Sequence, residues 1–321
     1  MVSLQTLGEQ LPWYWDRQAE PGLSSLHTPS NRSPSQVISF VEKRGVPVKQ
    51  ELGVVVVTFN SAAVVGDALQ SIDEDVDCIV VDNCSSDESV ARAIAHGAQV
   101  IRLETNVGFG KACNIGARAL TTPFILFLNP DARLRPGALR RLVEAATEHP
   151  EWAAVNPKLV TSRGDHYYRR RSLLLPPDAN ERLRQPPRGR QEVVMISGAA
   201  LLVRRVVFEE LGGFDEKIFM YFEDDDLAVR LRQAGWKLGY VGDAIVEHIG
   251  GFSSDPTPEL QEFKAYHLMR STLYATAKHR VEFNRTKRFF TCCFKWAIAA
   301  CRNATIRKAK YRGFIRALLE V

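Results

Sequence analysis

The sequence lacks the features that define several classes of protein. Its six cysteines form no CxxC pair and no zinc-ligand spacing, which excludes the common structural zinc sites and fits a protein with reduced thiols. No stretch reaches the run of about 18 apolar residues that a membrane-spanning helix needs. The nearest, residues 289–301, is short and contains Lys295. The first residues show no charged start followed by an apolar core and a small-residue cleavage site, so we expect no secretory signal and a cytoplasmic protein.

Acidic residues are almost absent from the C-terminal part of the chain. Between Lys278 and Arg316 there are twelve Lys or Arg residues and one acid, Glu282, although the net charge of the whole chain is only +5. Such a block binds anionic partners such as phospholipid, polyphosphate or nucleic acid, or it forms a solvated helix face. No nucleic-acid-binding motif accompanies it, so nucleic acid is the least favoured partner. We predict that residues 283–321 form a basic amphipathic helical tail, as a single helix, with an anionic membrane surface as a candidate partner.

Regular patterns are also missing from residues 1–50. Prolines at positions 12, 21, 29 and 34 stand among scattered Ser and Asn residues, and such segments resist regular structure. We predict a partly irregular N-terminal extension, followed by a main domain over residues 51–282.

Apolar segments alternate with helical patterns from Leu52 onward. The strands are rich in β-branched residues and are short, as expected for strands that are buried on both faces of a parallel sheet. This alternation predicts an α/β domain with a mainly parallel sheet. The predicted strands are 52–59, 78–82, 100–103 and 124–128, and the helices between them are 62–72, 88–96 and 111–120.

The second part of this domain is less regular. Residues 161–190 are rich in Arg and Pro and predict a long loop insertion, which in a compact domain is usually a lid or binding loop. Its arginines, Arg169 and Arg170 among them, could face a diphosphate. Helices are predicted at 135–149, from 223 and at 259–280, and strands at 193–196, 199–203 and 237–241.

Polar side chains follow the predicted strands at their carboxyl ends. Thr58 and Asn60 follow the first strand, Asp82 ends the second, and Asn129 and Asp131 follow the fourth. Parallel sheets bind ligands at this edge, so these residues predict a polar small-molecule site. Each of them could instead cap the helix that follows it.

Four consecutive carboxylates, Glu223–Asp226, follow an aromatic run and start a helical pattern. Leu227, Leu231 and Ala234 fall on one face of that helix. Acids at a helix start are favoured by the orphan N–H groups and by the helix dipole, so capping and solvation explain one or two of them. Four acids beside aromatic surface are more than capping needs. Because crowded carboxylates raise one another's pKa, one of them is a candidate general base.

Two further segments carry polar groups that could meet a ligand. Residues 106–114 contain two glycines and Lys111, but neither the P-loop spacing nor a dinucleotide-binding fingerprint. They form either a loop that approaches a ligand closely or a tight turn before a helix. His248 lies in a Gly-rich turn and could share a divalent cation with Asp131, with a diphosphate supplying other ligands. A lone histidine is more often structural.

The ordered set of these segments resembles the family 2 glycosyltransferases, and in particular their bacterial rhamnosyltransferase-type branch. That branch includes the enzymes that build polyprenyl-diphosphate-linked cell-wall glycans. The resemblance covers about residues 52 to 255 and implies a GT-A fold, a nucleotide-binding α/β/α sandwich with a helical C-terminal extension. Its donor half would span about 51–135 and its acceptor half about 136–282. The segments that carry it are Thr58–Asn60, Val81–Asn83, Asn106–Gly110, Asn129–Asp131, Ser197–Gly198, Gly213–Glu216, Phe222–Leu227 and Glu247–His248.

The resemblance implies roles for individual residues. Asp224 would be the general base with Glu223 beside it, which leaves Asp225 and Asp226 as capping or supporting groups. Asp131 looks like the last residue of the metal-binding DxD motif, and here Asn129 stands where many members have an acid. His248 matches a late histidine that contacts metal or diphosphate. The donor nucleotide would be bound by Thr58, Asn60, Asp82, Asn106, Gly108, Lys111 and Asn129, and the acceptor by Ser197, Gly198, Arg169 and Arg170.

The resemblance also implies a reaction. A sugar would pass from a nucleotide-sugar donor, with dTDP-L-rhamnose the first candidate, to a hydroxyl of a glycan or a polyprenyl-diphosphate-linked sugar. Inversion would accompany the transfer, Mn²⁺ or Mg²⁺ would be the cofactor, and the protein would work at the inner face of the cell membrane. Two alternatives remain: a sugar-nucleotide pyrophosphorylase, whose Gly-rich activating loop this chain lacks, and a non-catalytic nucleotide- or glycan-binding relative.

Overall fold

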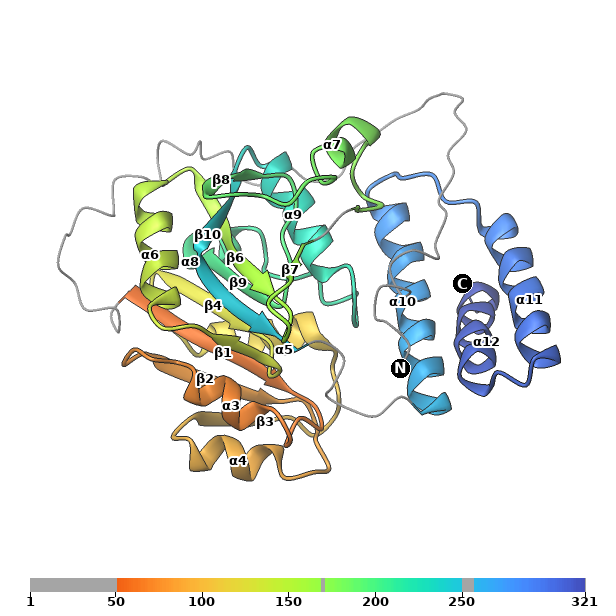
Figure 1. The fold of residues 1–321 in the computed structure, drawn as a ribbon, viewed down its shortest axis with the longest axis horizontal. Helices are drawn as coiled ribbons and strands as arrows, with labels where there is room; N and C mark the ends of the chain where they lie inside the picture. Colours follow the sequence, from red (N-terminus) through yellow and green to blue (C-terminus); the bar gives the residue numbers. More distant parts are fainter. Residues whose placement is uncertain (1–50, 169–170, 250–256, 321) are drawn as a thin grey trace.

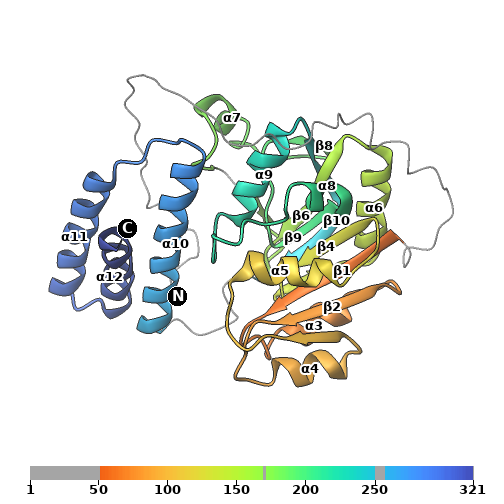
Figure 2. The ribbon, with the colours of Figure 1, turned by 180° about the vertical axis from the view of Figure 1, so that it is seen from behind.

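The computed structural model describes residues 51–168, 171–249 and 257–320. The predictions for the extension 1–50 and for Arg169 and Arg170 lie outside these residues. The described chain forms a ten-stranded sheet in the order β3-β2-β1-β4-β9-β6-β10-β5, with β7 paired to β6 and β8 paired to β10. Helices cover both faces of this sheet, and three further helices lie to one side of it (Figures 1 and 2).

The first four strands are the parallel βα units that the sequence predicts. They run parallel in the order β3-β2-β1-β4, and β1 is buried along its whole length. Of the helices that join them, α3 and α4 are shorter than predicted by one to three residues at each end, and α5 begins and ends two residues earlier than predicted. The elements are β1 (Leu52–Thr58), α3 (Val65–Gln70), β2 (Asp77–Asp82), α4 (Ser89–Ala95), β3 (Gln99–Arg102), α5 (Phe109–Arg118) and β4 (Phe124–Leu128).

The second half of the sheet is mixed. β9 pairs antiparallel with both β4 and β6, β10 runs parallel to β6, and β5 closes the edge antiparallel to β10. Its elements are β5 (Ala132–Leu134), α6 (Ala138–Glu148), β6 (Trp152–Val160), β7 (His166–Tyr167), α7 (Pro177–Glu181), β8 (Arg190–Val193), β9 (Ala200–Arg204), α8 (Arg205–Glu210), α9 (Glu223–Gln233) and β10 (Lys237–His248).

Several predictions for this half were wrong. β6 is a buried nine-residue strand that the sequence analysis missed, because its sequence has no β-branched run and contains Pro157, a residue that normally argues against a strand. β8 ends at Val193, where a strand was predicted to begin. β10 continues past Val241 to His248, across a register shift between Val241 and Ile245 in its pairing with β6.

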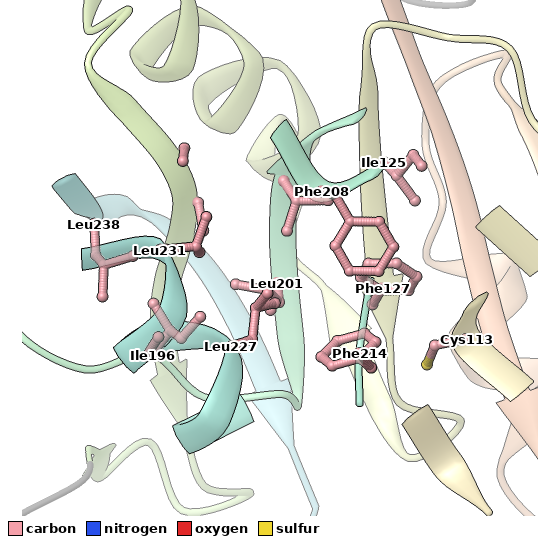
Figure 3. Packing of buried hydrophobic residues seen from close by; sticks show 14 of the residues in the cluster. Cys113, Ile125, Phe127, Ile196, Leu201, Phe208, Phe214, Leu227, Leu231 and Leu238 are labelled. Atoms are coloured by element: carbon pink, nitrogen blue, oxygen red, sulfur yellow. The ribbon is translucent and has the colours of Figure 1, made fainter. Parts of the chain in front are cut away.

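The strands alternate their side chains between two hydrophobic cores. Val55 and Val57 pack in the core under α5, α8 and α9, whereas Val54 and Val56 pack in the core under α3 and α6. The first of these cores is drawn in Figure 3, where Phe214 and Leu227 meet the central strands. Burial of each such side chain stabilises the fold by about 1.5–3 kcal/mol. Because α9 is part of this core, the acidic segment at its start is held at a fixed place over the sheet.

The last three helices form a bundle around a separate core. α10 (Pro258–Lys278) lies between the sheet and the other two helices, α11 (Arg285–Cys301) and α12 (Thr305–Leu319) (Figures 1 and 2). Met269 of α10 packs with Cys292 of α11 and Phe314 of α12. A Cβ on Gly313 would lie 2.3 Å from the carbonyl oxygen of Glu262, so α12 crosses α10 at close range. The prediction of a single helix in the tail was wrong, because the chain turns at Asn303, which has a positive φ of 50°. The division of the chain at 282/283 stays a prediction.

Candidate active site

The carboxyl ends of β1 and β2 bring together three of the predicted donor-binding residues. Thr58 lies opposite Asp82 in the parallel register, and its hydroxyl donates to Asp82 Oδ1 over 3.1 Å. Asp82 Oδ2 accepts the backbone N–H of Ser85 at 3.1 Å. Asn60, with φ 51°, accepts the N–H of Ser86 at 2.9 Å on its side-chain oxygen. Thr58 and Asp82 are almost completely buried, so they lie beneath the surface at this edge of the sheet. Asn60 links the loop after β1 to the loop after β2.

Asn106 and Gly108 connect this edge to the segment before the acidic helix. The side-chain oxygen of Asn106 accepts from Asn83 Nδ2 at 2.9 Å and from the N–H of Gly108 at 3.0 Å. Gly108 has φ 90°, and a Cβ there would lie 2.4 Å from the carbonyl oxygen of Phe219. That same oxygen accepts the N–H of Phe109 at 2.9 Å. Glycine is therefore required at position 108 by both backbone conformation and close approach.

Asn114 is a residue of the site region to which the sequence analysis gave no role. Its amide oxygen accepts the N–H of Phe214 and its amide nitrogen donates to the carbonyl oxygen of Phe214, both at 2.9 Å. This buried pair of hydrogen bonds ties α5 to the segment that leads to the acidic helix. Lys111, predicted to bind the donor, pairs with Glu216 of the same segment at 3.4 Å. The position of this amide, one to two helical turns after the two glycines, was the available signal. One amide side chain in a helix is nevertheless compatible with too many roles.

The four acids begin α9 behind two residues with left-handed backbone conformations. Tyr221 and Phe222 have φ 67° and 72°, which are rare for aromatic residues and cost on the order of 1–3 kcal/mol each. Glu223 is partly buried and Asp224 is buried. Asp224 Oδ2 accepts the N–H of Gly198 at 2.9 Å and its Oδ1 accepts the N–H of Asp225 at 2.8 Å. The strained turn thus presents Asp224 to the loop before β9, where Gly198 was predicted to lie.

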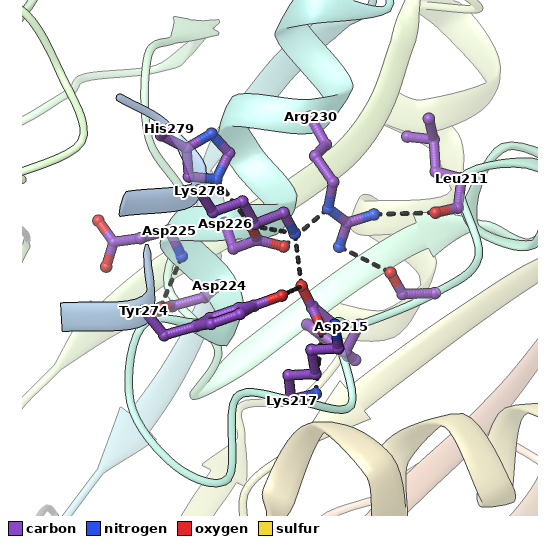
Figure 4. A network of polar contacts seen from close by, with 12 residues as sticks. Leu211, Asp215, Lys217, Asp224, Asp225, Asp226, Arg230, Tyr274, Lys278 and His279 are labelled. Atoms are coloured by element: carbon purple, nitrogen blue, oxygen red, sulfur yellow. Dashed lines mark hydrogen bonds and ion pairs between the residues drawn. The ribbon is translucent and has the colours of Figure 1, made fainter. Parts of the chain in front are cut away.

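Asp225 and Asp226 stand in the first turn of α9, as expected, but they are not solvated capping groups. Asp225 is 2% exposed and accepts the hydroxyl of Ser172 from the insertion. Asp226 is fully buried and contacts three basic side chains, shown in Figure 4: Arg230, Lys278 and His279, each at 2.7 Å.

The charge on Asp226 is stabilised by these partners. Burial alone would raise the pKa of Asp226, but the hydrogen bond from His279, the charge of Arg230 and the hydrogen bond from Lys278 together hold it well below its usual range. Lys278 also bonds Asp215 of the preceding loop at 2.6 Å. The sequence could not show this network, because Lys278 and His279 lie about fifty residues after Asp226 in the chain.

Asp131 and His248 lie next to each other on the β5–β10 edge. His248 pairs with Ala132 in the antiparallel register, and His248 Nε2 is 3.3 Å from Asp131 Oδ1. Both side chains are largely buried. The N–H of Asn129 donates to the carbonyl oxygen of Ala199 at 2.9 Å. This places the Asp131 turn beside the loop that contacts Asp224.

The donor set of this pair fits a divalent cation in part. A carboxylate oxygen and an imidazole nitrogen that lie close together across paired segments suit Mn²⁺ better than Mg²⁺. Among the residues that the structure describes, no group of three or more His, Cys, Asp or Glu side chains is placed to hold a metal. A cation at Asp131 and His248 therefore needs further ligands from a bound substrate.

The arrangement of sheet and helices is shared with a protein of known structure. The crystal structure of residues 1–349 of TarS from S. aureus superposes with a TM-score of 0.50 at 15% identity, covering 84% of this chain and 92% of that one. This likeness concerns the fold, which is of the GT-A type.

Sequence comparison defines the family more closely. The family described as Glycosyl transferase family 2 matches residues 53–212. An N-acetylglucosaminyl-diphospho-decaprenol L-rhamnosyltransferase of Mycobacterium tuberculosis is 31% identical over 216 residues, which cover 57% of this chain and 69% of the relative. The O-antigen chain rhamnosyltransferase RfbN of Salmonella typhimurium is 28% identical over 234 residues, 67% of this chain and 70% of that protein. The chain belongs to the family 2 glycosyltransferases.

These comparisons confirm the resemblance, the GT-A-type α/β fold and the assignment as a glycosyltransferase. The roles of the individual site residues stay predictions. In the part of the chain that the structure describes, every helix is too short or too polar to cross a membrane.

Proposed function

We propose that this glycosyltransferase moves a sugar from a nucleotide-sugar donor to an acceptor hydroxyl with inversion at the anomeric carbon. The observation that carries the proposal is the setting of Asp224. Its carboxylate is buried, is held by two backbone N–H groups, and follows two strained residues. Strained backbone of this kind persists where the surrounding structure enforces it, and it gathers at functional sites.

Asp224 is the general base in this proposal. It accepts the proton of the acceptor hydroxyl as that oxygen attacks the anomeric carbon and the bond to the nucleoside diphosphate breaks. The N–H groups of Gly198 and Asp225 fix the orientation of the carboxylate. Glu223 lies beside it at the start of the same helix. No covalent enzyme intermediate is required, so the reaction needs no nucleophilic side chain.

The donor lies across the carboxyl ends of the strands. We assign the nucleotide to the edge formed by Thr58, Asn60 and Asp82, where hydrogen bonds already join the two strand ends. Asp131 and His248 would hold Mn²⁺ or Mg²⁺ together with the diphosphate. When bound there, the cation supplies positive charge that offsets the charge developing on the leaving nucleoside diphosphate. The remaining donor-side residues are Asn106, Gly108, Lys111 and Asn129.

The relatives guide the choice of substrates. One is named a rhamnosyltransferase acting on N-acetylglucosaminyl-diphospho-decaprenol and another an O-antigen chain rhamnosyltransferase. We therefore propose dTDP-L-rhamnose as donor and a glycan or polyprenyl-diphosphate-linked sugar as acceptor, in the synthesis of cell-wall or surface polysaccharide.

Replacement of Asp224 by Asn tests the proposed base. The side chain keeps its size, so donor binding, followed as a donor-dependent rise in melting temperature with Mn²⁺, should persist while sugar transfer is lost. Asp178→Asn is a matched control, because Asp178 is an exposed acid on α7, and its turnover should equal that of the parent. Undiminished transfer by the Asp224 variant would refute the assignment.

The same preparations separate the two alternatives. A pyrophosphorylase would release pyrophosphate from a nucleoside triphosphate and a sugar phosphate. A non-catalytic relative would neither transfer sugar nor hydrolyse the donor in the presence of manganese.

We further propose that α11 places the protein on an anionic membrane surface at the inner face of the cell membrane. Phe290 and Phe294 are 65% and 68% exposed and lie four residues apart, on one face of the helix. Lys287 and Lys295 flank them. An exposed apolar stripe with basic neighbours is the pattern of helices that lie in the membrane interface.

Serine at both Phe290 and Phe294 should reduce co-sedimentation with vesicles that contain phosphatidylglycerol. Ile94→Ser is the control, since Ile94 is an equally exposed apolar residue, 60% exposed, on α4. Unchanged sedimentation of the double variant, or equal binding of the parent to neutral phosphatidylcholine vesicles, would contradict the proposal.

A further inference from the structure

A cavity of about 360 Å³ lies in the second half of the domain. Its wall is built by β6, β8, β10 and the segment that leads from β8 to Ser197, and the insertion covers it through His166–Tyr168 and residues 182–187. The volume is in the range of sites for small molecules, which is about 300–1,000 Å³. None of the residues assigned to the donor lines it.

The cavity is lined by aromatic rings together with a few polar groups. The ring of His166 lies 6.0 Å from that of Tyr240 at an interplanar angle of 26°, and 5.3 Å from that of Tyr168. The hydroxyl of Tyr240 lies 3.2 Å from His166 Nε2. Gln185, Gln191 and Glu192 add polar side chains. Flat rings that can pack on the C–H face of a pyranose, next to groups that bond its hydroxyls, are a composition suited to a sugar.

The rings of His166 and Tyr240 are both neutral near pH 7. Burial, together with the charge of Lys158, lowers the pKa of His166. Burial raises the pKa of Tyr240 to about 12. An uncharged ligand therefore meets no charged ring on this side of the cavity.

Hydrogen bonds connect the cavity wall to Asp224. The side chain of Asn156, which lines the cavity, accepts the N–H of Ser197 at 2.7 Å and donates to its carbonyl oxygen at 2.9 Å. The next residue, Gly198, donates its N–H to Asp224 Oδ2. The covering insertion is bound to the same helix by the hydroxyl of Ser172, which donates to Asp225.

The cavity also reaches toward the proposed diphosphate side. Tyr167, which lines the cavity, has its ring 6.0 Å from that of His248. The lining residue Ser197 thus precedes Gly198, which bonds Asp224, and the lining residue Tyr167 lies near the ring of His248.

We infer that this cavity binds the acceptor sugar, with His166 and Tyr240 as the platform for its ring. The inference rests on the proposed function, since it gives the acceptor of that reaction a place beside Asp224. It assigns acceptor recognition to the insertion and to β10, in addition to Ser197 and Gly198.

Binding of simple glycosides tests the inference without need for transfer. The probes are the methyl glycosides of N-acetylglucosamine, glucose and rhamnose, observed by saturation-transfer NMR with the full-length protein. At least one glycoside should give signals with the parent. His166→Ala should reduce them at least fivefold, and His166→Phe should restore them in part, because a ring is again present. His96→Ala is a matched control on α4, where His96 is exposed, and it should bind like the parent.

Other outcomes would overturn the inference. They are the absence of sugar signals with the folded parent, equal signals with His166→Ala, or signals from geranyl phosphate alone, which would indicate a lipid chain as the occupant. If His166→Ala does not fold, Tyr168→Ala replaces it. The Asp224→Asn variant should still bind the glycoside. Sugar transfer by this variant therefore tests the proposed function, whereas its glycoside binding tests this inference. The failure of one can thus be told from the failure of the other.

Discussion

Asp226 offers the sharpest test of how the acidic helix is held in place. Its carboxylate is fully buried and contacts Arg230, Lys278 and His279. Asn at this position keeps the volume but removes the negative charge, so Arg230 and Lys278 lose this counterion in a buried site. Removing one member of a buried ion pair costs about 3–5 kcal/mol. An amide oxygen can still accept one hydrogen bond, and Lys278 keeps its contact with Asp215, so we expect about 3 kcal/mol.

The loss should appear directly in thermal unfolding. A change of 1 kcal/mol shifts the melting temperature of a domain of this size by roughly 2–4 °C, so Asp226→Asn should melt roughly 6–12 °C below the parent at pH 7. Glu209→Gln serves as the control. Glu209 pairs with Arg205 on an exposed helix surface, where an ion pair is worth about 0–1 kcal/mol.

The difference between parent and variant should depend on pH with a defined sign. Because the folded protein holds the pKa of Asp226 well below its ordinary value, the stabilisation is complete above the unfolded-state pKa of about 3.9 and declines as the pH falls below it. At pH 3 the gap in stability should be smaller by roughly 1 kcal/mol than at pH 7. Other acids titrate in both proteins and cancel in the comparison. A shift below about 2 °C at pH 7, or a gap that widens in acid, would refute this account of the network.

Three further substitutions test other contacts of the site. Gly108→Ala should lower the free energy of unfolding by at least about 2 kcal/mol in urea titration, because its φ is 90° and the oxygen of Phe219 is close. Gly97→Ala is the control: its φ is 77° and nothing lies within 4 Å of a Cβ there, so it should lose only the stability that the strained backbone conformation costs. Asn114→Ala leaves two buried backbone groups of Phe214 without partners and should cost about 2–4 kcal/mol in the same titration; a cost below about 1 kcal/mol would contradict the contact. His248→Gln should raise the Mn²⁺ concentration for half-maximal transfer at least about tenfold, and an unchanged titration curve would remove His248 from the proposed metal site.

The sequence was sufficient to predict the first half of the sheet, with its parallel strands β1 to β4. The apolar runs that became β1, β2 and β4 are buried on both faces, and such strands are recognisable without knowledge of their neighbours. β6 was missed because it holds its place through tertiary contacts: its centre contains Asn156 and Pro157, and it lies between β9 and β10. Strand pairing of this kind overrides local propensity.

The site was predictable to the extent that its residues follow strands or cluster in the chain. Asp82 and Asp131 were found from strand ends, and Asp224 from the resemblance. The partners of these residues come from distant segments, as Gly198 does for Asp224 and His279 for Asp226. No pattern in one sequence states which distant group will neutralise a given acid. For this reason Asp225 and Asp226 were predicted only as capping or supporting groups, without their partners.

The position of α10 makes the C-terminal helices part of the mechanical support of the acidic helix α9. One side of this helix supplies Ser271, whose hydroxyl bonds the carbonyl oxygen of Met220, and Tyr274 and Lys278, which bond Asp215. Its other side shares an apolar core with α11 and α12. A protein shortened at residue 282 would expose Met269 to water while still relying on α10 to hold the turn before Glu223. Amide hydrogens of α9 and α10 should accordingly exchange with solvent in one cooperative opening, and truncation of the last two helices should speed exchange at both.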